Sequence, residues 1–264
     1  MKTIAQIKKQ KSKIVMVTCY DYAFAAAVDT AAVDMVLVGD SLANVVLGLE
    51  DTRKISVSEM INHTRAVAKG VKNALVIADM PYCSYQKNPQ QCLYFAEKFI
   101  KVGARGVKLE WFAGVLPLIR QLVKNKIPVM GHIGLTPQTA HLLGGYKIQG
   151  KDRASALNLV KQAKILEDYG VFSMVVECVP QEIGRLITQS IKVPTIGIGA
   201  GKFCRGQVLV LYDLLGLYQR ITPKFVRKYA DFFTATQTAI NQFAGDVRIG
   251  KFPSSTESYI LKNK

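Results

Sequence analysis

Two stretches of this 264-residue chain repeat one pattern and decide the fold: AEKFIKVGARGVKLE at residues 96–110 and AKILEDYGVFSMVVE at residues 163–177. Each runs from a helical pattern through a glycine into a short apolar segment that ends in a glutamate. The glycine suits the left-handed conformation that ends many helices. The apolar segment suits a parallel strand that is buried on both faces. The two stretches therefore predict consecutive helix–strand units.

The same alternation extends along the whole chain. Strands are predicted at residues 13–19, 34–39, 74–78, 106–110, 128–131, 172–177, 194–198 and 207–211. Helices are predicted at residues 22–32, 57–70, 89–102, 113–125, 153–169 and 181–190, with a long amphipathic pattern at residues 223–243. Alternating strands and helices form right-handed crossovers and a parallel sheet. Eight such units in one chain predict an α/β fold, a single (β/α)8 TIM barrel domain over residues 1–264 with an N-terminal helix.

The composition places the chain among globular proteins. Hydrophobic residues make up 49% of it and charged residues 20%, which is enough apolar material for one large core. The longest apolar runs have the length of strands, and MKTIAQIKKQKSK at the N-terminus lacks the apolar core of a signal peptide. The five cysteines include no CxxC pair, which argues against a disulfide framework or a thiolate zinc site. We expect a soluble, cytoplasmic protein with no membrane partner.

The formal net charge of +16 is the unusual feature of the composition. Such a charge invites a nucleic-acid-binding interpretation. However, the lysines and arginines are spread along the chain, and no recognised DNA- or RNA-binding motif accompanies them. An anionic substrate explains the charge equally well, so we expect no nucleic-acid partner.

Four carboxylates stand where an apolar run stops: Asp40, Asp79, Glu110 and Glu177. The carboxyl ends of barrel strands meet at one mouth, where barrel enzymes place their active sites. Three of these acids come from consecutive predicted strands, and an all-oxygen set suits Mg²⁺, with Mn²⁺, Co²⁺ or Zn²⁺ as substitutes. Glu177 comes from the other side of the ring among apolar neighbours. It is therefore a candidate proton acceptor, the alternative being a buried structural glutamate.

Three further side chains are candidates for the same site. Lys108 lies two residues before Glu110 and shares its face of the strand. It either binds an anionic substrate or forms a structural ion pair. Ser41 offers a hydroxyl for a substrate carboxylate, or serves as an ordinary helix cap or turn residue. His132, at the end of the fifth strand, is expected to support the site or contact substrate rather than to catalyse.

Seven motifs in order resemble the ketopantoate hydroxymethyltransferase family, also called 3-methyl-2-oxobutanoate hydroxymethyltransferase: VGDSLANVVLG, ADMPY, VKLE, GHIGLTPQ, GGYKIQG, VVECVP and VPTIGIGAG. The resemblance runs from about residue 3 to residue 252. It implies a barrel of the phosphoenolpyruvate/pyruvate type. It further implies transfer of a one-carbon unit from 5,10-methylenetetrahydrofolate to 3-methyl-2-oxobutanoate, which gives 2-dehydropantoate for pantothenate and coenzyme A biosynthesis. It also implies a homo-oligomer, possibly a decamer.

The resemblance assigns roles by motif. Asp40, Asp79 and Glu110 match the Mg²⁺ site, and Glu177 matches the proton acceptor. The keto-acid contacts match Asp40, Ser41, Asp79 and Lys108. The chain departs from the family at Ala43, where glycine is usual, and at residues 48–52. A Mg²⁺-dependent lyase or aldolase acting on another 2-oxo acid remains an alternative, because it needs the same metal and enolate chemistry without folate.

Overall fold

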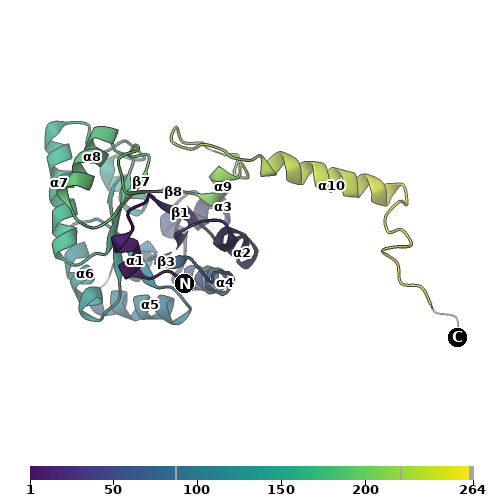
Figure 1. The fold of residues 1–264 in the computed structure, drawn as a ribbon, viewed down its shortest axis with the longest axis horizontal. Helices are drawn as coiled ribbons and strands as arrows, with labels where there is room; N and C mark the ends of the chain where they lie inside the picture. Colours follow the sequence, from purple (N-terminus) through teal and green to yellow (C-terminus); the bar gives the residue numbers. More distant parts are fainter. Residues whose placement is uncertain (87, 221, 262–264) are drawn as a thin grey trace. The chain divides into compact units, whose positions relative to one another are not determined.

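A computed structural model describes residues 1–86, 88–220 and 222–261. Eight parallel strands close into a barrel in which neighbours in sequence are neighbours in space, and β8 pairs with β1 (Figure 1). The predicted α/β barrel is therefore confirmed. The strands are β1 Ile14–Thr18, β2 Met35–Val38, β3 Leu75–Asp79, β4 Gly106–Glu110, β5 Val129–Gly134, β6 Ser173–Glu177, β7 Thr195–Ile198 and β8 Gly206–Leu209.

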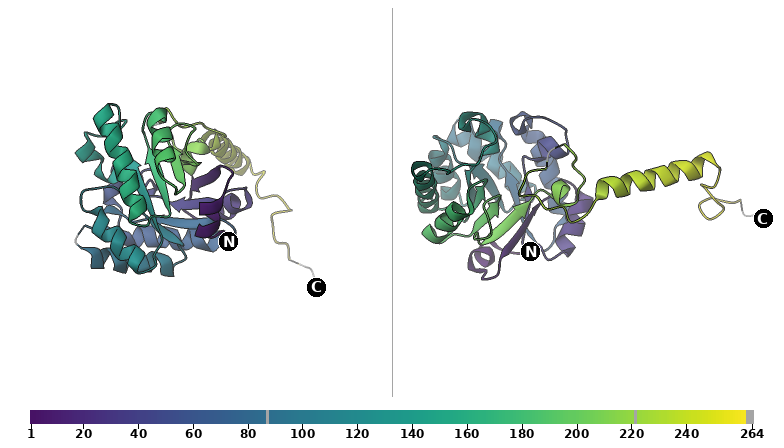
Figure 2. Two further views of the ribbon diagram at one scale, coloured as in Figure 1. Left: turned by 60° about the vertical axis from the view of Figure 1, so that its left-hand side comes forward. Right: turned by 90° about the horizontal axis from the view of Figure 1, so that it is seen from above.

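Helices follow most strands and surround the barrel (Figure 2). The α-helices are α1 Ile4–Lys9, α2 Tyr22–Thr30, α3 Leu42–Val45, α4 Val57–Gly70, α5 Pro89–Lys101, α6 Val115–Lys124, α7 Arg153–Asp168, α8 Gln181–Ser190, α9 Leu211–Leu214 and α10 Phe232–Arg248. Three short 3-10 helices lie in the loops: η1 Thr52–Lys54, η2 Tyr82–Ser84 and η3 Pro137–Leu143. Local sequence sets the helix starts, since Ser56 and Asp152 form capping boxes before α4 and α7.

The barrel interior is filled by apolar side chains, so the barrel is a packed core and not a pore. Helix α1 closes the amino ends of the strands, where Ile7 joins the core with 0% exposure. The chain around α1 is held there by the Lys2 backbone N–H, which donates to the Asn73 carbonyl, and by the ion pair between Lys2 and Asp34. The carboxyl ends of the strands lie at the opposite end of the barrel, where barrel enzymes place their active sites.

The C-terminal part differs from the predicted pattern. The amphipathic pattern at residues 223–243 predicts a helix there, but α10 is Phe232–Arg248. The start is set by Asp231, whose side chain accepts a hydrogen bond from the Thr234 N–H at 3.1 Å. The chain divides into two compact units, Met1–Leu211 and Tyr212–Lys264, and the barrel strands belong to the first.

Helix α10 carries no buried residue, although it presents several large apolar side chains. Across the described part of the chain, none of the helices combines the length and apolarity that crossing a membrane demands.

Candidate active site

The strand register gathers the candidate residues at the carboxyl end of the barrel. Asp79 of β3 pairs with Lys108 of β4, and Glu110 pairs with His132 of β5. Glu177 ends β6 beside Gly134 at the end of β5. All of these side chains are buried except that of Glu177, which is 16% exposed. Side chains far apart in sequence therefore form one cluster.

Lys108 lies within this cluster as a buried cation. Its Nζ is 2.7 Å from Asp79 Oδ1 and 3.2 Å from His132 Nδ1. The second oxygen of Asp79 accepts the backbone N–H of Asp40 at 2.9 Å. Burial opposes the charge on Lys108, but Asp79, Glu110 and Asp40 raise its pKa. The ammonium group therefore stays charged and ties the ends of β3 and β4 together.

His132 lies between two carboxylates. Its Nδ1 is 3.5 Å from Glu110 Oε1, and its Nε2 is 3.2 Å from Glu177 Oε2. Burial and the charge of Lys108 oppose protonation, but Glu110 and Glu177 outweigh them and raise the pKa of His132 to about 9. His132 thus connects the acid on β4 with the candidate base on β6.

The buried acids suit an additional cation. Burial raises the pKa of Asp79 to about 7, with Lys108 opposing the shift and Asp40 adding to it. Burial also raises the pKa of Glu110, and Glu110 Oε1 has no hydrogen-bond partner among the described residues. Within that part of the chain, no group of three or more histidine, cysteine or acidic side chains is arranged so that it could hold a metal ion by itself. Mg²⁺ usually takes one or two carboxylates and completes its octahedron with water and substrate oxygens, so these residues fit a magnesium site.

Ser41 is oriented by the end of β1. Its Oγ is 2.8 Å from the hydroxyl of Tyr20, which accepts a hydrogen bond from Thr18 Oγ1 at 2.7 Å. The Ser41 side chain makes no capping hydrogen bond to α3, so the helix-cap alternative does not describe it. Sequence reasoning missed Tyr20, because a tyrosine two residues beyond a strand carries no distinctive pattern.

Gly134 fixes the backbone beside Glu177. Its φ is +95°, and a Cβ at this position would lie 2.2 Å from the Glu177 carbonyl oxygen. That carbonyl accepts the Leu135 N–H at 2.9 Å. The second glycine of GHIGLTPQ is therefore required by the close approach of two strand ends, which holds the candidate base in place.

Gln138, at the end of the same motif, was also missed. It is 1% exposed and donates hydrogen bonds to both Glu110 and Asp40. Its only signal in the sequence was its position six residues after His132 in a loop that follows a barrel strand.

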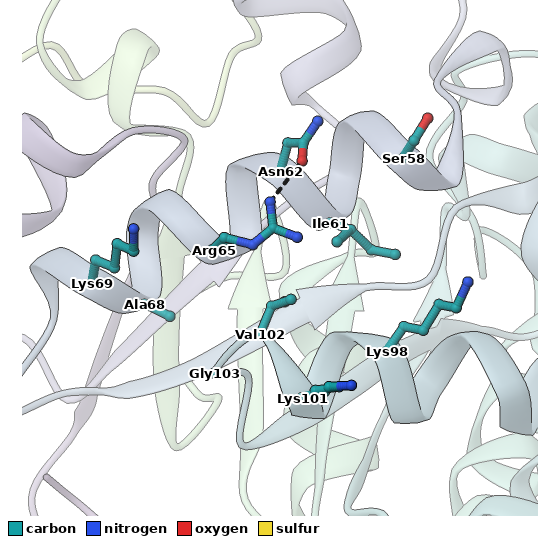
Figure 3. A pocket seen from close by; sticks show the side chains of 10 residues that line it. All are labelled: Ser58, Ile61, Asn62, Arg65, Ala68, Lys69, Lys98, Lys101, Val102 and Gly103. Carbon is teal, nitrogen blue, oxygen red and sulfur yellow. Dashed lines mark hydrogen bonds between the residues drawn. The ribbon is translucent and has the colours of Figure 1, made fainter.

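A separate hollow of about 780 Å³ lies between the helices of the outer layer (Figure 3). It is lined by residues of α4 and α5 and the turn that follows α5: Ser58, Ile61, Asn62, Arg65, Ala68, Lys69, Lys98, Lys101, Val102 and Gly103. Four of these are cations, and none is one of the strand-end acids. This basic surface is therefore distinct from the cluster at the barrel mouth.

Comparison with solved structures defines the class of protein. Phosphonopyruvate hydrolase in complex with oxalate and Mg²⁺ matches with a TM-score of 0.64 at 14% identity, over 96% of this chain and 91% of that one. A 2,3-dimethylmalate lyase of the PEP mutase/isocitrate lyase superfamily matches with a TM-score of 0.62 at 15% identity, over 98% and 93%. At such identities the likeness shows the fold alone. The chain therefore has the TIM-barrel fold of these enzymes.

Sequence comparison gives the family. The profile of the ketopantoate hydroxymethyltransferase family matches residues 1–255. The 3-methyl-2-oxobutanoate hydroxymethyltransferase of Bdellovibrio bacteriovorus is 48% identical over 262 residues, covering 98% of this chain and all of that one. The enzyme of the same name from Clostridium botulinum strain 657 is 45% identical over 258 residues, covering 97% and 94%. The chain belongs to the ketopantoate hydroxymethyltransferase family, a family of transferase enzymes.

Proposed function

We propose that this enzyme transfers a hydroxymethyl group from 5,10-methylenetetrahydrofolate to 3-methyl-2-oxobutanoate and forms 2-dehydropantoate for pantothenate and coenzyme A biosynthesis. The observation that carries the proposal is the placement of Glu177 beside the cluster of Asp40, Asp79, Lys108 and Glu110, to which His132 connects it. The names of the relatives supply the substrate and the transferred group.

The cluster provides the charges that a 2-oxo acid needs. Mg²⁺, held by Asp40, Asp79 and Glu110 directly or through water, would act as a Lewis acid toward the oxygens of the 2-oxo acid, a role that Mn²⁺, Co²⁺ or Zn²⁺ also suit. Lys108 supplies a fixed positive charge that stabilises negative charge developing on those oxygens. Ser41, oriented by Tyr20, donates its hydroxyl hydrogen to the substrate carboxylate.

Glu177 is the base of the proposed reaction. It removes the proton from C3 of the 2-oxo acid, and the carbon then attacks the methylene group of the folate. The two C–N bonds that join the methylene carbon to N5 and N10 of the folate break, and one water molecule supplies the hydroxyl group of the product. The proton from C3 and the remaining proton of the water go to N5 and N10, which gives tetrahydrofolate. His132 Nε2 lies 3.2 Å from Glu177 Oε2 as an ion-pair partner, without a hydrogen bond in the described part of the chain, so His132 supports the base or contacts the substrate rather than catalysing.

The resemblance to the family also bears on the oligomeric state and the cellular location of the protein. We propose a cytoplasmic homo-oligomer, a decamer if the family pattern holds. Support comes from α10, whose large apolar side chains are exposed in the single chain. An exposed apolar surface of this kind is typical of a protein–protein interface.

Replacement of Glu177 by glutamine tests the assignment of the base. In D2O with Mg²⁺, the wild-type enzyme should exchange the C3 proton of 3-methyl-2-oxobutanoate without folate. Glu177→Gln should lose at least about 100-fold of this rate, because the amide accepts no proton, while thermal unfolding and Mg²⁺ affinity change little. The matched control is Glu182→Gln on the exposed start of α8, which should behave as wild type. Exchange at the wild-type rate in Glu177→Gln would refute the assignment.

A further inference from the structure

Gln138 of η3 forms hydrogen bonds to two of the buried acids, Glu110 and Asp40. Its backbone N–H donates to Glu110 Oε2 at 2.9 Å. Its side-chain Nε2 donates to Asp40 Oδ2 at 3.0 Å and to the Met80 carbonyl at 3.1 Å. Its Oε1 accepts the hydroxyl hydrogen of Tyr85. One residue of the loop after β5 thus links carboxylates that belong to the ends of β2 and β4.

These partners fix the orientation of the Gln138 amide. A flipped amide would place Oε1 against the Asp40 carboxylate and the Met80 carbonyl, which are both acceptors. Tyr85 holds the opposite side of the amide and is itself buried at 2% exposure. The Tyr85 ring stacks on Phe112 with centroids 5.6 Å apart. The amide therefore presents its N–H groups to Asp40 in a single arrangement.

We propose that Gln138 is a positioning residue that hydrogen-bonds to one oxygen of Asp40 and one oxygen of Glu110 and so turns the other oxygen of each carboxylate toward a cation. In Glu110, Oε2 accepts the hydrogen bond from Gln138, whereas Oε1 has no hydrogen-bond partner in the described part of the chain and lies 3.5 Å from His132 Nδ1. This inference rests on the proposed function, which places Mg²⁺ at these acids.

The arrangement favours a small cation. Ca²⁺ accepts carboxylates through both oxygens and tolerates six to eight ligands, whereas Mg²⁺ requires near-octahedral geometry with few protein ligands. A hydrogen bond uses one lone pair of the accepting oxygen and holds the carboxylate in one orientation, which disfavours binding of a cation through both oxygens. Gln138 therefore biases the site toward Mg²⁺ and against Ca²⁺, without touching the ion itself.

Gln138→Met tests this role, because methionine keeps the length of the side chain and removes both the donor and the acceptor groups. Titration calorimetry with MgCl2 and with CaCl2 measures the two affinities. We expect the Mg²⁺ affinity to fall about tenfold, as for other residues that orient metal ligands, and the ratio of Mg²⁺ to Ca²⁺ affinity to fall as well. Tyr85→Phe removes only the hydroxyl that holds the amide and should shift the ratio in the same direction by less. Gln189→Met, on an exposed position of α8, should leave both affinities unchanged.

An unchanged ratio in a folded Gln138→Met protein overturns the proposal, and so does an equal loss of both affinities or a wild-type chain that binds neither cation. If Gln138→Met does not fold, the ratio in Tyr85→Phe decides in the same way. The two proposals fail separately. If the ratio of Mg²⁺ to Ca²⁺ affinity falls in Gln138→Met but the wild type forms no 2-dehydropantoate, only the proposed function is refuted. If the wild type forms 2-dehydropantoate but the ratio is unchanged in Gln138→Met, only the role of Gln138 is refuted.

Discussion

Lys108 shows what a buried charged residue costs and what offsets that cost. An unpaired ammonium group at 4% exposure would be strongly destabilising. Asp79 lies 2.7 Å away, and the charges of Glu110 and Asp40 add to its effect. Because burial raises the pKa values of two acids in this cluster, Asp79 and Glu110, the cluster has room for a further positive charge. The ion pair is therefore structural and at the same time part of the proposed substrate site.

Asp40→Ala is predicted to weaken Mg²⁺ binding much more than folding. The Asp40 side chain accepts from Gln138, and its charge raises the pKa of Asp79, so its removal relieves a like-charge repulsion while deleting a ligand. We expect at least about a tenfold loss of Mg²⁺ affinity and a change of about 1 kcal/mol or less in the free energy of unfolding. Calorimetric titration and denaturant unfolding measure the two quantities. Asp168→Ala, at an exposed position, is the control and should bind Mg²⁺ as the wild type does. Unchanged Mg²⁺ binding in Asp40→Ala would show that the metal assignment is wrong.

The charged candidates of the site were predictable because of where they stand in the sequence. A carboxylate at the end of an apolar strand is conspicuous, and two-residue spacing places Lys108 and Glu110 on one face. Gln138, Tyr85 and Tyr20 are neutral and lie in loops or just beyond a strand. The contacts of Gln138 and Tyr85 form only when η3 folds back onto the end of β4, and that of Tyr20 with Ser41 only when the ends of β1 and β2 meet; no local pattern records either.

At the scale of the element, capping residues and apolar runs explain why the barrel was predictable. The predicted strand at residues 106–110 and the helix at residues 57–70 coincide with β4 and α4. The last helix was predicted nine residues too early at its start, because the amphipathic pattern continues through residues 223–231 while the capping carboxylate is Asp231. A hydrophobic pattern predicts a face, whereas the cap decides where the helix begins.

Helix α10 is predicted to mediate self-association. Phe233, Ile240 and Val247 are spaced seven residues apart, which places them on one face, and they are 46%, 59% and 46% exposed. The double change Ile240→Asp and Val247→Asp should reduce the mass of the assembly measured by light scattering, because it puts charge on that face. Gln242→Asp, which adds a charge to a different face, should leave the mass unchanged. A wild-type monomer, or an assembly of undiminished mass in the double variant, would contradict the prediction.

At the scale of the whole molecule, the closed parallel barrel explains how acids from β2, β3, β4 and β6 reach one mouth. The excess of basic residues has a different distribution. The cations Arg65, Lys69, Lys98 and Lys101 line the hollow of α4 and α5 in the outer layer. The composition gives the net charge but not the position of the basic residues. The four cations become neighbours only when α4 and α5 pack side by side.

The most direct test of the proposed function is product formation from purified components. The enzyme is incubated with 3-methyl-2-oxobutanoate, 5,10-methylenetetrahydrofolate and Mg²⁺, and 2-dehydropantoate is measured with and without folate. We expect 2-dehydropantoate only when the folate is present, and no cleavage of other 2-oxo acids or hydroxy acids. Turnover that is independent of folate, with cleavage of such an acid, would contradict it and would favour a lyase or aldolase.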